Sequence, residues 1–216
     1  MNEALTNALV ALKKNRFDVY FAENKEEARE IALSLIPEGA SIAVGGSATI
    51  DQLGLLSEFR NGKYRFIDRY DFASQEEREE KFRLGLTADV FVMSSNAVTE
   101  DGILYNVDGR GNRIAALDYG PKSVVVIAGR NKIVPTLKDA VLRVKTVAAP
   151  LNARRLNCGT YCAEKGHCLS VDQGCAENMT AGCGSRGRIC SRYSVQAMQF
   201  VPDRIKVILV DDELGF

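Results

Sequence analysis

Short, almost wholly apolar runs that alternate with helical patterns constrain the fold of this chain more than any other feature. Two of them, SVVVIAG and KVILV, contain hardly any polar residue, which is typical of parallel strands covered by helices on both faces. With three similar runs, the predicted strands are Asp18–Phe21, Ser41–Val44, Asp89–Met93, Ser123–Ala128 and Ile205–Val210. The alternation predicts an α/β fold with a mostly parallel sheet flanked by helices.

Helical spacing and capping signals place helices between these strands. The first 15 residues and Lys25–Ile36 both carry apolar residues at helical spacing. Three more helices are indicated by sequence signals for a helix start. A Thr49-x-x-Gln52 capping box precedes Ile50–Phe59, and a Ser74-x-x-Glu77 capping box opens another helix. Pro135 precedes the third, Leu137–Val147. One segment breaks the alternation, because Ile103–Val107 and Arg113–Leu117 flank the turn sequence Asp108-Gly-Arg-Gly-Asn112. It predicts a β-hairpin inserted in the α/β body.

Charge and composition exclude several classes of protein. Lys+Arg and Asp+Glu both total 28, so the balanced charge gives no overall attraction to nucleic acid or to an anionic membrane. No apolar run approaches the ~20 residues of a membrane span, and the first 15 residues lack the layout of a signal peptide. We therefore expect a cytoplasmic protein without a nucleic-acid partner or a membrane span. The loop GGSAT is not a G-x-G-x-x-G fingerprint, so NAD is not supported.

All six cysteines lie between residues 158 and 190, in a Gly-rich stretch with little periodicity. Such a stretch has no apolar core of its own, so we expect its thiols to order it. A reducing compartment favours metal binding or redox chemistry over a disulfide knot. Thiolates select zinc, copper(I) or iron–sulfur. We expect a [4Fe–4S] cluster, with zinc and free or disulfide-forming thiols as alternatives.

The cysteine spacing matches neither a bacterial ferredoxin run nor a paired C-x2-C zinc knuckle. His167, the only histidine, directly precedes Cys168 and leaves a Cys3His zinc site open. Five arginines around the stretch would offset the negative charge of a thiolate cluster, and these are Arg154, Arg155, Arg186, Arg188 and Arg192. The chain then divides into an α/β domain over 1–156, a Cys-rich module over 157–192, and a final helix or strand over 193–216 that returns to the domain.

Three polar loops follow predicted strands, over 45–49, 94–102 and 129–132. Ligands of parallel α/β sheets bind beyond the carboxyl ends of the strands, where these loops would meet. Paired glycines before a helix allow backbone N–H groups to approach an anion, and Ser47 and Thr49 add hydroxyl groups. With Arg130 and Lys132, the loops predict a phosphate, a carboxylate or a similar anion as ligand. Glu100 and Asp101 are candidates for a base or nucleophile. Each feature also has a structural explanation: helix capping alone would account for Thr49, and a hairpin turn would account for Glu100-Asp101-Gly102.

Four stretches, GGSATIDQLG, SSNAVTEDGILYNVDGRGNR, GPKSVVVIAGRNKIV and RVKTVAAPLNARRL, make residues 1–156 similar to the LUD domain of lactate-utilisation proteins. The resemblance implies a NagB/RpiA/CoA-transferase-like fold and a cytoplasmic location. It also implies a part in the oxidation of L-lactate to pyruvate, beside iron–sulfur partner subunits. It therefore indicates a pathway more than a reaction.

The recurrent positions of that family correspond here to Gly45, Gly46, Ser47, Thr49, Asn96, Thr99, Glu100, Asp101, Gly102, Asn106, Asp108, Gly109, Gly111, Asn112, Arg113, Gly129, Asn131 and Lys132. In the wider superfamily, a Gly-rich loop after a strand cradles a phosphate or a CoA-type group, and an acidic residue acts as base or nucleophile. By this analogy Glu100 and Lys132 are the candidate catalytic residues. The expected ligand-binding residues are Gly45, Gly46, Ser47, Thr49, Asn96, Thr99, Asp101, Asp108, Asn112, Arg113, Arg130 and Asn131.

Some members of the family end in a C-x5-C-x2-C-x6-C pattern. Cys162-x5-Cys168 and Cys183-x6-Cys190 resemble its two halves, with the 14 residues Leu169–Gly182 in place of the central two. The resemblance therefore implies Cys162, Cys168, Cys183 and Cys190 as metal ligands, with Cys158 and Cys175 as alternates.

These features are compatible with three alternative functions. The first is a redox component of lactate or 2-hydroxy-acid metabolism that carries an iron–sulfur cluster. The second is an isomerase- or transferase-like enzyme with a structural zinc or cysteine module. The third is a non-catalytic regulatory or assembly subunit. The sequence leaves open whether the chain is an enzyme.

Overall fold

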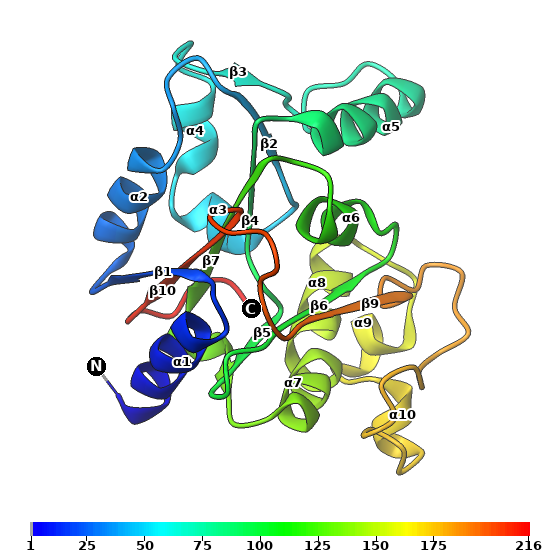
Figure 1. The fold of residues 1–216 in the computed structure, drawn as a ribbon. Coiled ribbons are helices and arrows are strands. Elements are labelled where there is room, and N and C mark those ends of the chain that lie inside the picture. The colour runs from blue at the N-terminus through cyan, green and yellow to red at the C-terminus, as the bar shows by residue number, and fades with distance from the viewer. Residues whose placement is uncertain (1) are drawn as a thin grey trace.

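A six-stranded parallel sheet forms the centre of the computed structural model, which describes residues 2–216 (Figure 1). Its order is β1-β10-β7-β4-β2-β3, and every neighbouring pair is parallel. The strands are β1 (Asp18–Ala22), β2 (Ser41–Val44), β3 (Arg65–Phe66), β4 (Val90–Met93), β7 (Ser123–Gly129) and β10 (Ile205–Val210). The predicted α/β fold with a mostly parallel sheet is confirmed, and all five predicted strands lie in this sheet.

Helices cover both faces of the central sheet because its strands are apolar on both sides. The helices α1 (Glu3–Lys14) and α6 (Asn112–Asp118) pack Leu5, Leu12 and Leu117 against one face. The opposite face is covered by α2 (Lys25–Ser34), α3 (Ala48–Gln52) and α4 (Leu55–Phe59). The carboxyl ends of the strands remain free for loops. None of the helices formed by the described residues is long and apolar enough to cross a membrane.

A second, four-stranded sheet lies beside the first, in the order β8-β5-β6-β9. Its strands are β8 (Ile133–Val134), β5 (Ala97–Thr99), β6 (Leu104–Asp108) and β9 (Arg192–Gln196). The helix α7 (Leu137–Arg143), a π-helical turn (Val144–Ala148) and α8 (Ala149–Arg155) form one continuous helical stretch whose apolar face packs on this sheet. The remaining helical segments are α5 (Gln75–Leu84), α9 (Tyr161–Lys165), α10 (Leu169–Asp172) and two 3-10 turns, Gly85–Thr87 and Arg130–Lys132.

The second sheet fixes the position of the C-terminal end of the Cys-rich stretch. The strand β9 follows the last cysteine and pairs antiparallel with β6. The residues between α8 and β9 therefore form a loop-rich segment that contains α9 and α10, at the lower right of Figure 1.

The predicted hairpin between Ile103–Val107 and Arg113–Leu117 is wrong. A hairpin is present, but it joins β5 to β6, and residues 112–118 form α6. Gly111 has a φ of 94°, and the Asp108 side chain accepts the backbone N–H of Ile114 at 3.0 Å. The glycine-rich turn therefore starts a helix, because a carboxylate satisfies a free N–H of its first turn.

The predicted capping role of Thr49 is also wrong. Ser47 is the N-cap of α3, and its side chain accepts the N–H of Ile50. The predicted helix over Ile50–Phe59 is divided at Gly54, which has a φ of 66°. Because Ser47 supplies the cap, the Thr49 hydroxyl is available for other contacts.

Candidate functional site

A pocket of about 210 Å³ opens beyond the carboxyl ends of β2 and β4. Gly46 and Ser47 reach it from the loop after β2, Ser94 from the loop after β4, and Lys132 from the turn after β7. The structure thus brings the three polar loops together. A space of this size suits a small metabolite, because sites for drug-sized ligands are typically about 300–1,000 Å³.

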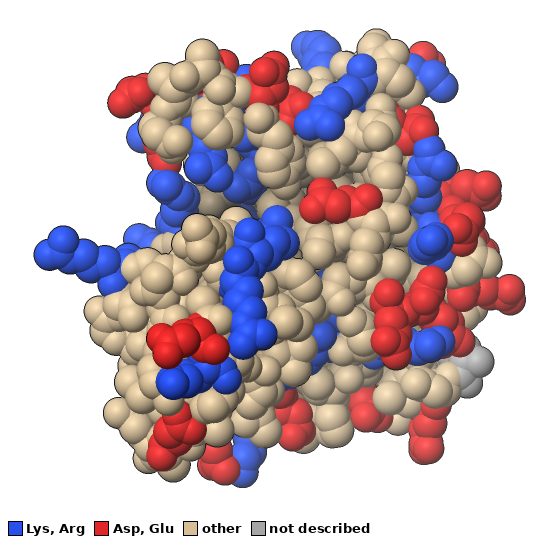
Figure 2. All heavy atoms as spheres, turned by 180° about the vertical axis from the view of Figure 1, so that it is seen from behind, with Lys and Arg blue, Asp and Glu red and all other residues tan. Residues whose placement is uncertain are grey.

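The walls of the pocket are strongly basic. Five arginines and one lysine line it, and Asp108 is the only acidic residue among the lining residues that the structure describes. Figure 2 shows Lys and Arg side chains gathered around a hollow at the left of the view. An excess of positive charge in a concave site raises the local concentration of anions. The basic residues are Arg69, Arg78, Arg110, Arg113, Lys132 and Arg155.

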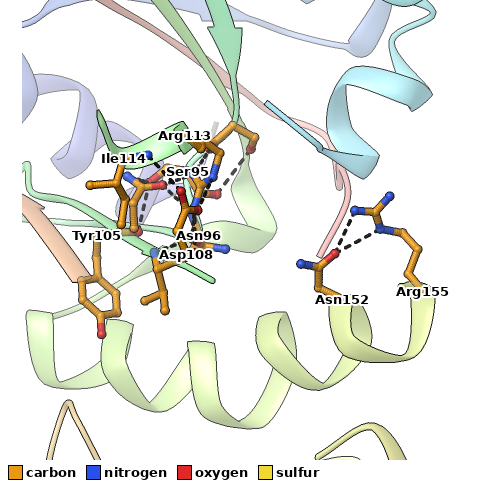
Figure 3. A network of polar contacts seen from close by, with 11 residues as sticks. Ser95, Asn96, Tyr105, Asp108, Arg113, Ile114, Asn152 and Arg155 are labelled. Carbon is orange, nitrogen blue, oxygen red and sulfur yellow. Dashed lines mark hydrogen bonds and ion pairs between the residues drawn. The ribbon is translucent and has the colours of Figure 1, made fainter. Parts of the chain in front are cut away.

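Arg113 is the hub of a buried polar network (Figure 3). Its guanidinium pairs with Asp108 at 3.0 Å and donates to the Ser94 carbonyl at 2.9 Å and to Asn96 Oδ1 at 2.6 Å. It also contacts Asn106 and the carbonyl of Val107. Because all of its donor nitrogens have protein partners, Arg113 holds the loops in place. Gly45 belongs to this arrangement, since a Cβ there would lie 2.9 Å from Arg113.

Arg69 and Arg78 have donor groups without a protein partner. The Nε atoms of both are buried and make no hydrogen bond in the described part of the chain. Their guanidinium groups lie over the ring of Phe82, at 4.5 and 5.4 Å from its centroid. Burial lowers the pKa of Arg69, and the nearby positive charges of Arg78 and Arg155 contribute. Both arginines line the pocket, and no ion pair with another described residue neutralises either of them, so their positive charges remain available to an anionic ligand.

Arg155 and Asn152 project from α8 on the other side of the pocket, as Figure 3 shows. Asn152 Oδ1 accepts hydrogen bonds from Arg155 Nε at 3.1 Å and Nη2 at 2.9 Å. The amide therefore orients the guanidinium without neutralising it.

Lys132 is the most deeply buried cation of the pocket, with 3% of its surface exposed. Its ammonium group donates to Ser94 Oγ at 2.7 Å and to Thr49 Oγ1 at 2.8 Å. It has no ion pair with any described carboxylate. Burial, together with the charges of Arg143 and Arg113, lowers the pKa of Lys132 to about 7. A lysine with such a pKa is uncharged in a large fraction of molecules at neutral pH.

Residues 214–216 lie against this lysine. The Leu214 carbonyl accepts from Thr49 Oγ1 at 3.2 Å, and the N–H of Gly215 donates to Gln52 Oε1 at 2.7 Å. Gly215 has a φ of 61°, and a Cβ there would lie 2.6 Å from Thr49 Oγ1. Phe216 lines the pocket.

The predicted site residues divide into two groups. Seven of them line the pocket, namely Gly46, Ser47, Asn96, Asp108, Asn112, Arg113 and Lys132, and Thr49 lies next to them through its bond to Lys132. Thr99, Glu100, Asp101, Arg130 and Asn131 do not line it. Glu100 instead accepts from Asn7 Nδ2 at 2.8 Å on the side of α1.

The remaining predicted residues also have structural partners. The Thr99 hydroxyl bonds to Asp101 and accepts the N–H of Ile103 within the β5–β6 turn. Arg130 donates to the carbonyl of Asp211 at 2.8 Å, and Asn131 bonds to the backbone of Leu214 and Gly215. The sequence analysis missed Arg69, Arg78 and Arg110, and it placed Arg155 beside the cysteines. No motif or spacing marks these arginines.

A second, smaller cavity of about 20 Å³ is lined by cysteines. Cys162, Cys168, Cys183 and Cys190 all face it, whereas Cys158 and Cys175 do not. The rest of the lining is mostly apolar, with Tyr105, Val141, Val144 and Met179 among the residues. The four cysteines of the two family-like pairs, Cys162-x5-Cys168 and Cys183-x6-Cys190, therefore line one cavity.

Cations and hydrogen-bond donors surround these four thiols. Arg188 donates to the carbonyls of Cys190 and Cys183 at 2.9 and 3.2 Å, and Lys145 lines the cavity. Burial opposes ionisation of Cys183, but hydrogen bonds from Ser185 and from the Tyr161 backbone outweigh it and lower the pKa of this thiol. Burial raises the pKa of Cys190. Within residues 2–216, no three His, Cys, Asp or Glu side chains are arranged to hold one metal ion.

The two cavities share a wall. Ile189 lines the basic pocket, and the next residue, Cys190, lines the cysteine cavity. Val107 also lines the basic pocket and belongs to the apolar cluster against which Cys190 and Tyr193 pack.

A family model and two solved structures are similar to this chain to different extents. A family model described as the LUD domain matches residues 5–210. A DUF162 family protein from Deinococcus radiodurans, solved by crystallography, has a similar fold, with a TM-score of 0.52, 17% identity and 96% of each chain covered. eIF2B delta from Chaetomium thermophilum matches 63% of this chain and 53% of its own, at 15% identity and a TM-score of 0.33. No curated protein matches.

Proposed function

Since this chain belongs to the LUD domain family, we propose that it is a redox component of lactate or related 2-hydroxy-acid utilisation. In this proposal a [4Fe–4S] cluster is held by Cys162, Cys168, Cys183 and Cys190, and a small anion binds in the adjacent basic pocket. The observation that carries the proposal is the single cavity that all four of these cysteines line. When bound, the cluster would accept and release electrons.

The donor set fits an iron–sulfur cluster chemically. Four thiols face an enclosed and mostly apolar space, and such surroundings exclude water from a cluster. Arg188 and Lys145 would offset the negative charge of the thiolates and sulfides. Ser170 and Thr160 lie 3.3 and 3.4 Å from the sulfurs of Cys168 and Cys162, so hydroxyl groups are also available to the ligands.

Thiolates are ligands for zinc as well as for iron–sulfur clusters. As the four cysteines lie in the structure, no three His, Cys, Asp or Glu side chains among the described residues are arranged to hold one metal ion. The cavity is about 20 Å³, so binding a cluster requires the surrounding loops to move outward.

The shared wall supports a redox role for the pair of sites. Electron transfer is fastest over short distances, and consecutive residues, Ile189 and Cys190, face the two cavities. The basic pocket suits a small carboxylate, because arginine forms paired hydrogen bonds with that group. A 2-hydroxy or 2-oxo acid is a carboxylate of suitable size.

A second candidate function is an isomerase- or transferase-like enzyme in which the cysteines are structural. The observation that favours it is Lys132, a buried amine with a pKa lowered to about 7 at the wall of the basic pocket. Glu100 does not line that pocket, so catalysis there would depend on Lys132.

Anaerobic purification with iron and sulfide analysis tests the proposed cluster. We expect a brown protein with a broad absorbance near 400 nm that dithionite bleaches, containing about four iron atoms per chain for a cubane cluster. Single replacement of Cys162, Cys168, Cys183 or Cys190 by Ala should remove most of the iron, because each would supply one ligand. A colourless anaerobic preparation that contains stoichiometric zinc would contradict the proposal.

The two remaining cysteines provide matched controls. Cys158→Ala and Cys175→Ala remove a thiol from the same stretch without touching the cavity, so iron content and absorbance should stay at the wild-type level. Loss of iron in either control, with retention in one of the four variants, would show that the ligand set is different.

A further inference from the structure

Lys132 has surroundings that do not suit a permanent positive charge. The side chain is 3% exposed, and the charged groups that act on it are Arg113 from α6 and Arg143 from α7, both positive. Its other close neighbours are hydroxyl groups, Thr49 from α3 and Ser94 from the loop after β4. A buried charge is costly unless an opposite charge accompanies it, so the uncharged amine is favoured.

The hydrogen bonds of Lys132 leave the nitrogen lone pair of that amine free. An uncharged amine has two N–H groups, and Ser94 Oγ and Thr49 Oγ1 accept one each. Both hydroxyls donate elsewhere, Thr49 to the Leu214 carbonyl and Ser94 to the Ser95 carbonyl. Neither hydroxyl therefore needs to donate to the lysine. The nitrogen is fixed in position with a lone pair available at the pocket wall.

We propose that Lys132 is a nucleophile that forms an imine with a small carbonyl compound carrying an anionic group, of the 2-oxo-acid class. The proposal rests on the anion-binding pocket described under the proposed function, and it is independent of the cysteine cavity. Arg69 and Arg78, which line the pocket and form no ion pair with another described residue, supply positive charge for the anionic group, and Lys132 reacts with the carbonyl carbon.

The reaction needs no further reactant. The lone pair of Lys132 Nζ forms a C–N bond, and the electron pair of the carbonyl double bond passes to its oxygen, which takes up a proton. The amine loses a proton, which gives a neutral carbinolamine. Loss of the hydroxyl group with a proton as water then forms the C=N bond. Protonation of the imine makes it a stronger electron acceptor than the ketone, and this weakens the bonds to the neighbouring carbon.

Reductive trapping of the purified full-length chain tests this chemistry. The protein is incubated with pyruvate and cyanoborohydride at pH 7.5, and the adduct is located by intact mass and peptide mapping. We expect one adduct per chain, located on Lys132. Acetone lacks the carboxylate, so it should label Lys132 on the order of tenfold less, the effect of about 1.4 kcal/mol of arginine–carboxylate binding.

Other lysines and variants serve as controls. Lys145 is a second buried lysine, 6% exposed, but it lines the cysteine cavity, and Lys122 is exposed. Neither should be labelled above background. Lys132→Arg keeps a positive charge but cannot form an imine, so it should abolish the adduct. Wild-type mapping remains decisive if that variant does not fold.

Each other outcome has a distinct meaning. Equal labelling of Lys132 and exposed lysines overturns the proposal. Stabilisation of the wild-type chain by pyruvate in a thermal melt, without an adduct on Lys132, overturns the imine and leaves the anion pocket intact. If pyruvate gives no stabilisation and no adduct, both the imine and the anion pocket are overturned. The iron analysis tests the cluster separately.

Discussion

Buried positive charge without a carboxylate partner indicates that the basic pocket is a binding site and not only a place where loops pack together. Lys132, in the pocket wall, and Arg143, whose charge acts on Lys132, are 3% and 8% exposed, and neither forms an ion pair with another described residue. Arg143 donates instead to the carbonyls of Asn131 and Asn96, at 3.1 and 2.6 Å. Buried charges cost free energy, and titratable groups with perturbed pKa values cluster at functional sites.

Replacing Lys132 by Met should change how stability depends on pH. The folded chain releases the Lys132 proton near pH 7, whereas the unfolded chain releases it near 10.5. Between these values the unfolded state binds more protons, so the stability of the wild type rises with pH. The free energy of unfolding of the wild type, minus that of Lys132→Met, should increase by up to about 5 kcal/mol over this range.

Urea denaturation at pH values from 7 to 10 measures that difference. Lys122→Met, which removes an exposed lysine, is the matched control. A difference for Lys132→Met that does not change with pH would contradict the low pKa of Lys132.

The sequence identifies some pocket residues and not others for a physical reason. Ser47, Asn96, Asp108 and Lys132 follow strands or belong to recognisable loops, so their edge of the sheet can be predicted. Arg69 lies in a segment without regular structure, and Arg78 belongs to a strongly polar helix. Their positions depend on how the chain returns over the sheet, which local periodicity does not specify.

At the scale of elements, the pair Asp108–Arg113 joins β6 to α6. Both side chains are about 10% exposed, and Asp108 also accepts the N–H of Ile114 in the first turn of the helix. A single carboxylate therefore caps α6 and neutralises the guanidinium that holds the loop after β4.

Replacing Asp108 by Ala should destabilise the protein by about 3–5 kcal/mol, because it leaves a buried guanidinium unpaired. The matched control is Glu79→Ala, which removes the partner of Arg110 in a pair whose side chains are 37% and 57% exposed. That change should cost less than about 1 kcal/mol. Similar midpoints for the two variants in urea denaturation would contradict a structural role for Asp108.

Elements were predicted well where burial on both faces leaves a clear pattern. All five apolar runs form strands of the central sheet. The prediction failed at residues 113–117, because a short amphipathic run has no decisive period and the start signal resides in the Asp108 side chain. The split between α3 and α4 was also missed, since one glycine at a φ of 66° decides it.

At the scale of the whole molecule, the basic pocket is assembled from parts that are distant in the sequence. Arg78 comes from α5, Lys132 follows β7, and Arg155 comes from α8. The loops after β2 and β4 complete it. Ligand binding should therefore be separable from fold stability at lining side chains that, like Arg78, form no ion pair with another described residue.

Replacement of Arg78 by Met tests this separation. Removing a guanidinium that faces the ligand should weaken pyruvate binding by about tenfold or more, the cost of a charged hydrogen bond, while the melting temperature stays near the wild-type value. Arg83→Met is the control, because Arg83 is on the same helix but is 70% exposed and pairs with Glu80. Calorimetric titration of both variants measures the effect, and equal affinities would place the ligand elsewhere.

Because of the π-helical turn at Val144–Ala148, the geometry of both sites depends on the exact number of residues in the helical stretch over 137–155. A π turn is an α-helix with one additional residue, and removing that residue would rotate everything after it by about 100°. Asn152 and Arg155 would then turn away from the basic pocket, while Ala149 would shift relative to the cysteines. Deletion of Thr146 or Val147, which line neither cavity, would therefore disable both sites. Insertions and deletions in this short turn are expected to be selected against.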